Sequence, residues 1–379
     1  MIIAIPKEKD LNESRVSCTP GSVKVMIKAG FEVHVEKGAG LKSFFTNKEY
    51  ENSGAKIISD ANKLLSESDI ILKVNPPNHD EIKHIKNECI YISFFQTTRS
   101  LEEVEALNKK SITGFSMHLV PRTTLAQKMD ALSSQANIAG YKSVLMAATR
   151  LGLYMPLLMT AAGTIRPAKV LILGAGVAGL QAIATAKRLG SQVEVFDVRP
   201  IVKEQVESLG AKFIEVESES NEGVGEGGYA KETSDEYKQK QKDLIHEHIS
   251  KSNIVITTAL IPGKPAPLLI PKNMVESMKP GSIIMDLASE NGGNCELTSK
   301  DEIITHNQVT IDGTSNIPGL MPVHASELYG KNISALLLYM AKDGEINIDM
   351  EDEIISGSMF THQGKITNQQ TKQALEELK

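Results

Sequence analysis

The sequence has few cysteines, no excess of basic charge and no uninterrupted apolar run of membrane length. Its 379 residues include three cysteines, Cys18, Cys89 and Cys295. They are odd in number, far apart and without metal-ligand spacing, which indicates a reducing cytoplasm and argues against a metal site. Lys and Arg number 41 against 47 Asp and Glu, a net charge of −6. This balance predicts neither a nucleic-acid surface nor a polybasic membrane anchor.

The start of the chain and one apolar stretch bear on membrane insertion. The opening MIIAIPKEKD carries acids and lacks the apolar core of a signal peptide, so we expect a protein that is not exported. Residues 144–165 are mostly apolar over about the length of a bilayer span, but Arg150, Gly152 and Pro156 interrupt them. A charge in mid-span is costly in lipid, so we expect a buried helix bent at the proline rather than a membrane span.

Short β-rich runs alternate with helical patterns along most of the chain. The runs include IIAI, FEVHV, AKII, DIILKV, CIYISFF and ITGFS, and later VEVFD, AKFIEV, NIVITTA, SIIMDLA and QVTIDG. This alternation is typical of a parallel sheet with helices on its faces, and the chain is longer than one core usually serves. We predict an α/β protein of two doubly wound, Rossmann-like domains with parallel sheets, joined by a long helix over about residues 134–162.

The end of the chain bears on the domain limits. Residues 326–342 read as an amphipathic helix that needs a packing partner, so we expect the chain to return to the first domain. That domain would comprise residues 1–137 and about 325–379, and residues 138–324 would form the second domain. The polar stretch 343–379 is expected to be a tail or linker.

The most informative segment is 169–197, KVLILGAGVAGLQAIATAKRLGSQVEVFD. An apolar strand leads into Gly174, Gly176 and Gly179 in G-x-G-x-x-G spacing, with Val177 inside the motif. The first glycine permits a tight turn, the second lets the backbone approach a pyrophosphate, and the third lets the helix pack on the strand. Free N–H groups at the helix N-terminus then face the phosphates. Strand, helix, strand and acid follow in the required order, which indicates a dinucleotide site rather than a glycine-rich turn without a ligand.

The acid that ends the second strand bears on which nicotinamide cofactor binds. Asp197 is placed to accept hydrogen bonds from the adenosine ribose hydroxyls and would repel a 2′-phosphate. The second domain is therefore predicted to bind NAD(H) rather than NADP(H).

A long polar insertion separates the runs AKFIEV and NIVITTA and contains Tyr229 in a glycine-rich, acidic context. Connections of this length are usually functional or disordered. Two interpretations stay open: a solvated loop that runs into a charged helix, or a mobile lid whose Tyr229 closes over bound nucleotide.

A dehydrogenase that oxidises an alcohol or amine needs a proton-transfer group near the nicotinamide. None of the nine histidines has a context that singles it out, although His118, at the end of an expected strand, comes closest. After that strand, Arg122, Gln127 and Asp130 offer donors and acceptors suited to a carboxamide, in a loop of the kind that binds ligands. Asp130 and Ser133 are equally well explained as caps of the next helix.

The segment PRTTLAQKMDALSSQANIAGY resembles the Arg-Gln-Asp loop of the NAD(H)-binding component of proton-translocating NAD(P)+ transhydrogenase. Nearly the whole chain shares the resemblance, through IPKE with ESRVSCTP, LKVNPP, GAGVAG with VFDVRP, EGGYAKE, TTALIPGKPAP and MDLASENGGN. In that family the component is a peripheral, usually dimeric domain that passes hydride from NADH to NADP+ on a separate domain, coupled to proton flow through a membrane domain.

The resemblance implies partners and a location. It implies a homodimer with membrane-embedded and NADP(H)-binding partner subunits, held by them at the cytoplasmic face of the inner membrane without inserting itself. The sequence stops without the membrane helices that some members fuse to this domain, which predicts an alpha component encoded as a separate chain.

The resemblance also assigns roles residue by residue. Four residues of the first domain would position the nicotinamide and its ribose: Arg122, Gln127, Asp130 and Ser133. Six of the second would contact the rest of the nucleotide: Asp197, Val198 and Arg199 at the adenosine ribose, Tyr229 in the lid, and Gln241 and Leu260.

Alanine dehydrogenase shares this resemblance and has counterparts of Arg15 and Lys73 that bind its amino-acid substrate. Where it has a catalytic histidine this chain has Gln96, and Glu290-Asn291 replace its catalytic aspartate before Gly-Gly. An amide does not shuttle protons at ordinary pH, whereas transfer between two nicotinamides needs no such group. We therefore predict a transhydrogenase component, with an amino-acid dehydrogenase and a non-catalytic NAD(H)-sensing subunit as the alternatives.

Overall fold

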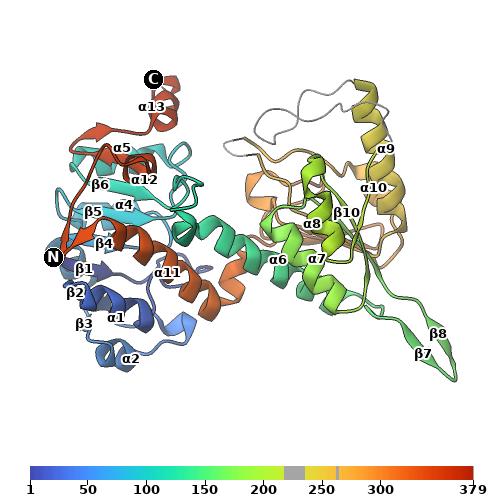
Figure 1. The fold of residues 1–379 in the computed structure, drawn as a ribbon, viewed down its shortest axis with the longest axis horizontal. Helices are drawn as coiled ribbons and strands as arrows, with labels where there is room; N and C mark the ends of the chain where they lie inside the picture. The colour runs from blue at the N-terminus through green and yellow to red at the C-terminus, as the bar shows by residue number, and fades with distance from the viewer. Residues whose placement is uncertain (217–234, 262–263, 379) are drawn as a thin grey trace. The chain divides into compact units, whose positions relative to one another are not determined.

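The computed structural model describes residues 1–216, 235–261 and 264–378, which divide into two compact units. Unit 1 is Met1–Gln135 with Pro318–Lys379, and unit 2 is Ala136–Ile317. Each contains one large, mainly parallel sheet with helices beside it (Figure 1). The predicted α/β class with parallel-dominated sheets is confirmed.

Unit 1 has an eight-stranded sheet in the order β19-β18-β6-β5-β4-β1-β2-β3. Its parallel strands are β1 (Ile2–Ile5), β2 (Glu32–Glu36), β3 (Lys56–Ile58), β4 (Ile70–Leu72), β5 (Ile90–Ser93) and β6 (Thr113–Ser116). From β1 the chain first builds outward through β2 and β3, then crosses to β4 on the other side of β1. A reversal of this kind is a topological switch point, where a crevice opens at the carboxyl ends of the strands.

Two apolar cores lie on opposite faces of this sheet, because successive side chains of a strand alternate in direction. Ile70 and Leu72 belong to one core, and Ile71 between them belongs to the other. The first core contains residues of α1 (Pro20–Lys28), α2 (Asn47–Asn52) and α11 (Pro322–Tyr339). The second contains residues of α3 (Ala61–Glu67), α4 (His79–His84), α5 (Leu101–Lys109) and α13 (Gln369–Glu377). The helix predicted over 326–342 is confirmed as α11, beginning four residues earlier at Pro322.

The polar stretch 343–379 is not the tail or linker that its composition predicts. It follows the short strands β16 (Ala341–Lys342) and β17 (Glu345–Ile346) with α12 (Glu353–Ser358), β18 (Met359–His362), β19 (Lys365–Ile366) and α13. Strand β18 pairs antiparallel with β6 and extends the sheet of unit 1. Met359 and Phe360 are fully buried in its two cores. The prediction was wrong because the buried apolar residues of this segment, Ile354, Ile355, Met359 and Phe360, are too few to raise its mean hydropathy.

Unit 2 has a seven-stranded sheet in the order β11-β10-β9-β12-β13-β15-β14. Its parallel strands are β9 (Lys169–Leu173), β10 (Gln192–Phe196), β11 (Lys212–Phe213), β12 (Ile254–Thr257), β13 (Ile283–Asp286) and β15 (Val309–Asp312). The edge strand β14 (Ile303–His306) is antiparallel and was not predicted. The helices of this unit include α7 (Val177–Arg188), α8 (Lys203–Ser208), α9 (Asp235–Lys251) and α10 (Lys272–Glu276). The switch point lies between β9 and β12.

The long connecting helix is α6 (Ala131–Arg150), and the limit between the units falls within it. The helix expected to continue to residue 162 ends at Arg150, whose guanidinium contacts the buried Asp312 carboxylate (2.7 Å). Beyond it, β7 (Leu158–Thr160) and β8 (Gly163–Ile165) form a hairpin that extends from the body of unit 2 (Figure 1). The expectation of a bent, buried helix was therefore wrong: the helix ends at Arg150, two residues before Gly152, and does not reach Pro156. Among the described residues, no helix has both the length and the apolarity that a bilayer span requires.

Candidate nucleotide-binding site

The three glycines after β9 differ in what surrounds them. Gly174 has φ +106°, and a Cβ there would lie 2.5 Å from Thr258 Oγ1. A Cβ on Gly179 would lie 1.9 Å from the Gly174 carbonyl oxygen. No atom lies within 4 Å of a Cβ built on Gly176. The fold therefore requires glycine at the first and third positions, whereas at the second the absent side chain leaves open space.

That open space lies at the beginning of α7. Gly176 is the N-cap of this helix, and among the residues that the structure describes no side chain caps its first N–H groups. Val177, the first helical residue, is 41% exposed. Unpaired N–H groups and the helix dipole together favour an anion at such an end. An open helix N-terminus behind a glycine, at the switch point of a parallel sheet, fits the pyrophosphate of a dinucleotide.

Asp197 follows β10 beside this loop. Its Oδ2 accepts from the Ala175 N–H (2.7 Å) and from Arg199 Nη2 (3.0 Å). Its Oδ1 accepts from the Arg199 N–H (2.8 Å) and Nε (3.0 Å). The Asp197 side chain is 5% exposed and that of Arg199 is 38% exposed. Between them, Val198 is exposed. The acid thus connects the fingerprint loop to the turn after β10.

The loop after β12 reaches the same edge of the sheet. Thr258, directly after β12, donates its hydroxyl to the carbonyls of Leu173 (3.3 Å) and Gly174 (3.1 Å). Leu260, two residues further along this loop, is 52% exposed. The structure therefore brings the predicted contact Leu260 to the strand end next to the glycine fingerprint.

Asn294 holds the loop after β12 at two points. Its Nδ2 donates to the carbonyls of Ala259 (2.9 Å) and Pro267 (2.8 Å), and its Oδ1 accepts from the Ala259 N–H (3.1 Å). Asn294 is itself held by the buried Asp286 carboxylate, which accepts its backbone N–H (2.8 Å). Neither residue was predicted to have a role, although both belong to the quoted motif MDLASENGGN.

Two predicted nucleotide contacts of unit 2 remain, Gln241 and Tyr229. Gln241 lies on α9 and is half-buried. Tyr229 lies outside the described residues, so the structure neither supports nor opposes the lid interpretation.

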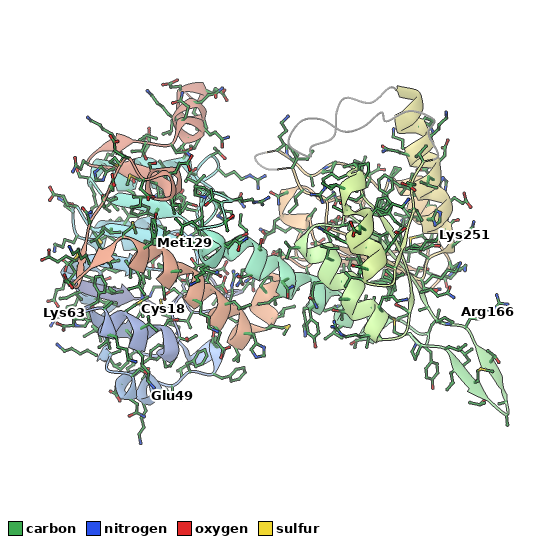
Figure 2. The ribbon with its side chains drawn as sticks, viewed as in Figure 1. Cys18, Glu49, Lys63, Met129, Arg166 and Lys251 are labelled. Carbon is green, nitrogen blue, oxygen red and sulfur yellow. The ribbon has the colours of Figure 1, made fainter. Side chains whose placement is uncertain are left out.

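The four predicted nicotinamide-positioning residues lie together in unit 1, between β6 and the first turn of α6. Arg122 and Gln127 are exposed, Gln127 at the start of the 3₁₀ turn η2 (Gln127–Met129). Asp130 accepts hydrogen bonds from the Ser133 N–H (2.9 Å) and Oγ (2.6 Å) and so caps α6. Met129 anchors the turn in the core of unit 1 (Figure 2). The capping role is therefore present, and a role in binding would be additional to it.

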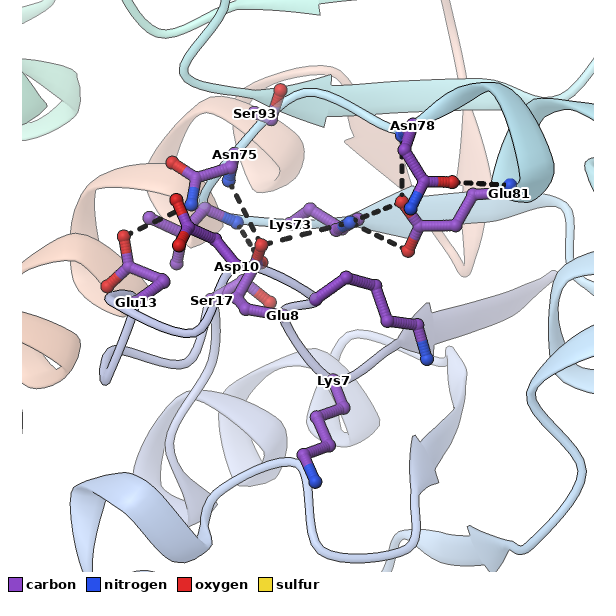
Figure 3. A network of polar contacts seen from close by, with 12 residues as sticks. Lys7, Glu8, Asp10, Glu13, Ser17, Lys73, Asn75, Asn78, Glu81 and Ser93 are labelled. Carbon is purple, nitrogen blue, oxygen red and sulfur yellow. Dashed lines mark hydrogen bonds and ion pairs between the residues drawn. The ribbon is translucent and has the colours of Figure 1, made fainter.

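The switch point of unit 1 holds a buried cluster of charged side chains (Figure 3). Lys73, directly after β4, donates to both carboxylate oxygens of Glu81 (2.8 Å each) and lies 3.8 Å from Glu8. Arg15 bonds Glu13 through Nε (2.8 Å) and Nη2 (2.7 Å). All five side chains are buried. Three carboxylates and two cations thus occupy the place where unit 2 has open space.

Burial shapes the protonation of this cluster. It raises the pKa of Glu8 to about 7, although the Lys73 ammonium opposes the shift. Burial has the same tendency at Glu13, but the Arg15 guanidinium outweighs it and holds the pKa of Glu13 below its usual value. Of these two glutamates, Glu8 is therefore the one whose carboxyl is partly protonated near neutral pH.

Three further residues bear on the comparison with alanine dehydrogenase: His118, Gln96 and Glu290. His118 is half-buried, accepts the Phe95 N–H at Nδ1 (3.1 Å), and has its pKa lowered by desolvation to about 4. It is therefore a hydrogen-bonded histidine that is neutral near pH 7. Gln96 is half-buried and Glu290 is exposed. In the part of the chain that the structure covers, no three His, Cys, Asp or Glu side chains are grouped to hold a metal ion.

Two family models match the chain. Residues 4–139 match the alanine dehydrogenase/PNT N-terminal domain, and residues 143–369 match the alanine dehydrogenase/PNT C-terminal domain. The second match includes residues that the structure assigns to unit 1, because the chain returns there after Pro318.

Similar proteins carry transhydrogenase and alanine dehydrogenase names. The chain is 46% identical to an NAD(P) transhydrogenase alpha-subunit chain of Rhodospirillum rubrum, over 97% of this chain and 98% of that one. It is 46% identical to NAD(P) transhydrogenase subunit alpha of Haemophilus influenzae, over 96% of this chain and 71% of that one. An alanine dehydrogenase of Methanococcus maripaludis is 28% identical, over 97% of this chain and 94% of that one.

A solved structure is similar along almost the whole chain. The crystal structure of transhydrogenase from Sinorhizobium meliloti superimposes with a TM-score of 0.87 at 44% identity, covering 97% of this chain and all of that one. The resemblance inferred from the sequence motifs is confirmed.

Proposed function

This chain belongs to the alanine dehydrogenase/PNT family, and within that family we propose that it is the NAD(H)-binding component of a proton-translocating NAD(P)+ transhydrogenase. In this role it holds NADH while hydride passes directly to NADP+ on a partner subunit. The observation that carries NAD(H) binding is the open, uncapped N-terminus of α7 behind Gly176, beside an acidic strand end. The transhydrogenase names of the relatives at 46% identity support the choice of reaction.

The residues of unit 2 would hold the nucleotide by its phosphates and adenosine. Gly174, Gly176 and Gly179 shape the loop and α7 supplies N–H donors for the pyrophosphate. Asp197 would accept hydrogen bonds from the adenosine ribose, with Val198 and Arg199 beside it. Leu260 and Gln241 would add contacts, and Tyr229 would be the lid residue.

The residues of unit 1 would act by positioning. Bound NADH supplies the hydride, and no proton has to be transferred by the protein in the same step. Arg122, Gln127, Asp130 and Ser133 would orient the nicotinamide and its ribose. Holding a reacting ring in one orientation and excluding water accounts for much of the acceleration in such reactions.

The partners proposed are a second copy of this chain, a membrane-embedded subunit and an NADP(H)-binding subunit. The β7–β8 hairpin and the segment before it favour the homodimer, because Leu157 and Met159 are 53% and 72% exposed, and Leu153 and Tyr154, a few residues earlier in the sequence, are exposed as well. Exposed large apolar side chains that gather into a patch are typical of a protein interface. Through its partners the chain would lie at the cytoplasmic face of the inner membrane.

The domain division we propose for this function keeps residues 1–137 and about 325–379 as the first domain. Residues 138–324 would then be the NAD(H)-binding domain.

The decisive experiment mixes this chain with a purified NADP(H)-binding partner domain, NADH and an NADP+ analogue. Rapid reduction of the analogue that needs both proteins is the expected result. NADH binding without any transfer would contradict the proposal and favour a sensing subunit. Oxidation of alanine by NAD+ with this chain alone would instead identify an amino-acid dehydrogenase.

The variant Asp130→Asn tests whether Asp130 positions the nicotinamide in addition to capping α6. Asparagine caps helices about as well as aspartate, so stability should change by less than about 0.5 kcal/mol. Removal of the carboxylate should slow hydride transfer by about tenfold or more, and weaken NADH binding by less. Transfer rate and NADH affinity are measured on the same preparation. Equal losses in both would contradict a positioning role, and Asp130→Ala gives the cost of losing the cap, about 1 kcal/mol.

A further inference from the structure

The Arg199 guanidinium donates two hydrogen bonds to the Asp197 carboxylate, the group predicted to bind the adenosine ribose. We propose that Arg199 and the adenosine ribose compete for the Asp197 carboxylate, and that Arg199 is a latent 2′-phosphate contact which Asp197 keeps occupied. The inference rests on the proposed binding of NAD(H) and concerns how the same subsite refuses NADP(H).

The Asp197 carboxylate is fully occupied by hydrogen-bond donors. A carboxylate has about four acceptor positions. Four donors occupy them: the N–H groups of Ala175 and Arg199, and Nε and Nη2 of Arg199. The structure therefore leaves Asp197 no acceptor position for a ribose hydroxyl while the guanidinium stays in place.

The four donors differ in how readily they can leave. Two are backbone N–H groups, and that of Ala175 belongs to the glycine loop itself. The other two belong to one guanidinium on a side chain that is 38% exposed. Rotation of the Arg199 side chain alone frees two acceptor positions, and a ribose offers two hydroxyl donors, at O2′ and O3′. NAD(H) thus exchanges one pair of donors for another at a fixed carboxylate.

A 2′-phosphorylated ribose meets the opposite situation. It lacks the 2′-hydroxyl donor and brings negative charge, which Asp197 repels. The guanidinium, by contrast, matches a phosphate bidentately. The contact with Asp197 holds the Arg199 guanidinium away from that role. Asp197 therefore excludes NADP(H) twice, once by repulsion and once by retaining the arginine.

The test measures dissociation constants for NADH and NADPH by fluorescence titration, without any partner protein, for four forms: wild type, Arg199→Ala, Asp197→Asn and the double variant. Arg199→Ala should bind NADH about two- to fivefold more tightly, as expected for removing a competitor from a partly exposed ion pair, and should still refuse NADPH. Asp197→Asn should bind NADH about tenfold more weakly and NADPH at least tenfold more tightly than wild type. The double variant should lose that gain for NADPH.

Lys203→Ala is the matched control. Lys203 lies four residues beyond Arg199, pairs with Glu215 rather than Asp197, and has the same charge. Its loss should change the ratio of the two dissociation constants by less than about twofold, because exposed charges at a distance are screened.

The outcomes are distinguishable. Weaker NADH binding by Arg199→Ala would make the arginine a direct nucleotide contact and overturn the competition. No gain of NADPH binding by Asp197→Asn, in a variant that keeps the melting temperature of wild type, would overturn the latent phosphate contact. If Asp197→Asn does not fold, the NADH affinity of Arg199→Ala still decides the competition. Failure of the wild type to bind NADH would refute the proposed function instead.

Discussion

The two switch points of this chain have the same topology and opposite contents. In each unit, the chain builds three parallel strands to one side and then crosses beside its first strand, so a crevice is expected at β1/β4 and at β9/β12. In unit 2 the loop after β9 is made of glycines and opens in front of α7. In unit 1 the loops after β1 and β4 bring Glu8 and Lys73 together with three other buried charges.

The difference shows that the strand order provides a crevice in both units, and that the residues in the loops around it determine whether a ligand can enter. Glycine at the second fingerprint position leaves space for the pyrophosphate of a nucleotide. Ionisable side chains at the corresponding place in unit 1 satisfy one another and fill the crevice. The variants below test whether one switch point serves stability and the other binding.

The largest effect is expected for Lys73→Met in unit 1. The substitution leaves Glu8 and Glu81 buried without their cation, so the free energy of unfolding should fall by about 3–5 kcal/mol. Urea unfolding measures this change. The NADH affinity of the folded fraction should stay within about twofold, since unit 2 keeps its loop.

Lys83→Met is the control for Lys73. Its ion pair with Asp80 is exposed, so its loss should cost at most about 1 kcal/mol. A similar cost for both variants would mean that the cluster of unit 1 contributes no more than a surface pair.

The next largest effect is expected for Glu8→Gln, in how the free energy of unfolding depends on pH. Burial raises the pKa of Glu8 from 4.5 to about 7, so the folded protein retains a proton here that the unfolded chain releases. Wild type therefore loses stability from this group as pH rises from about 4.5 to about 7. Glu8→Gln lacks that loss, so its stability relative to wild type should rise by up to about 3 kcal/mol across this window.

Unfolding curves at pH 5, 6, 7 and 8 measure this difference, with exposed Glu67→Gln as the control. A constant difference between Glu8→Gln and wild type from pH 5 to 8 would show that Glu8 is ionised throughout.

The smallest change in stability, with a distinct change in binding, is expected for Gly176→Ala. Its φ is −77° and no atom lies within 4 Å of the added Cβ, so stability should fall by less than about 1 kcal/mol. The methyl group would occupy the space proposed for the pyrophosphate, and NADH should bind about tenfold more weakly, which titration measures.

Gly152→Ala is the matched control, because it also meets no atom within 4 Å but lies beyond the end of α6. Its NADH affinity should equal that of wild type. Unchanged NADH binding by Gly176→Ala would mean that the glycine loop does not contact the nucleotide. The two switch points would then not differ in their use for binding.

The elements near the candidate site were largely predictable from the sequence. The strand, glycine loop, helix and acid of 169–197 appear as β9, α7, β10 and Asp197, because their pattern is local: apolar runs, glycines at fixed spacing and a short-range helix period. The cap of α6 by Asp130 was predictable for the same reason.

Long-range arrangement was harder to predict. The apolar stretch 144–165 has the hydropathy of one helix, but residues 158–165 form an exposed hairpin. Residues 343–379 have the composition of a tail, but β18 completes the sheet beside β6. Hydropathy reports average polarity, so it misses a buried pair such as Met359 and Phe360 and assigns exposed apolar residues to the interior.

The α/β class, the nucleotide fingerprint and the family all follow from the sequence, since each rests on residues close together in the chain or on motifs spread along it. The folded chain was needed to show that Asp197 is held by Arg199, that Asn294 fixes the loop after β12, and that Glu8, Glu81 and Lys73 meet in unit 1. These contacts depend on which side chains face each other, and on acceptor positions already filled. Neither property is encoded in local periodicity.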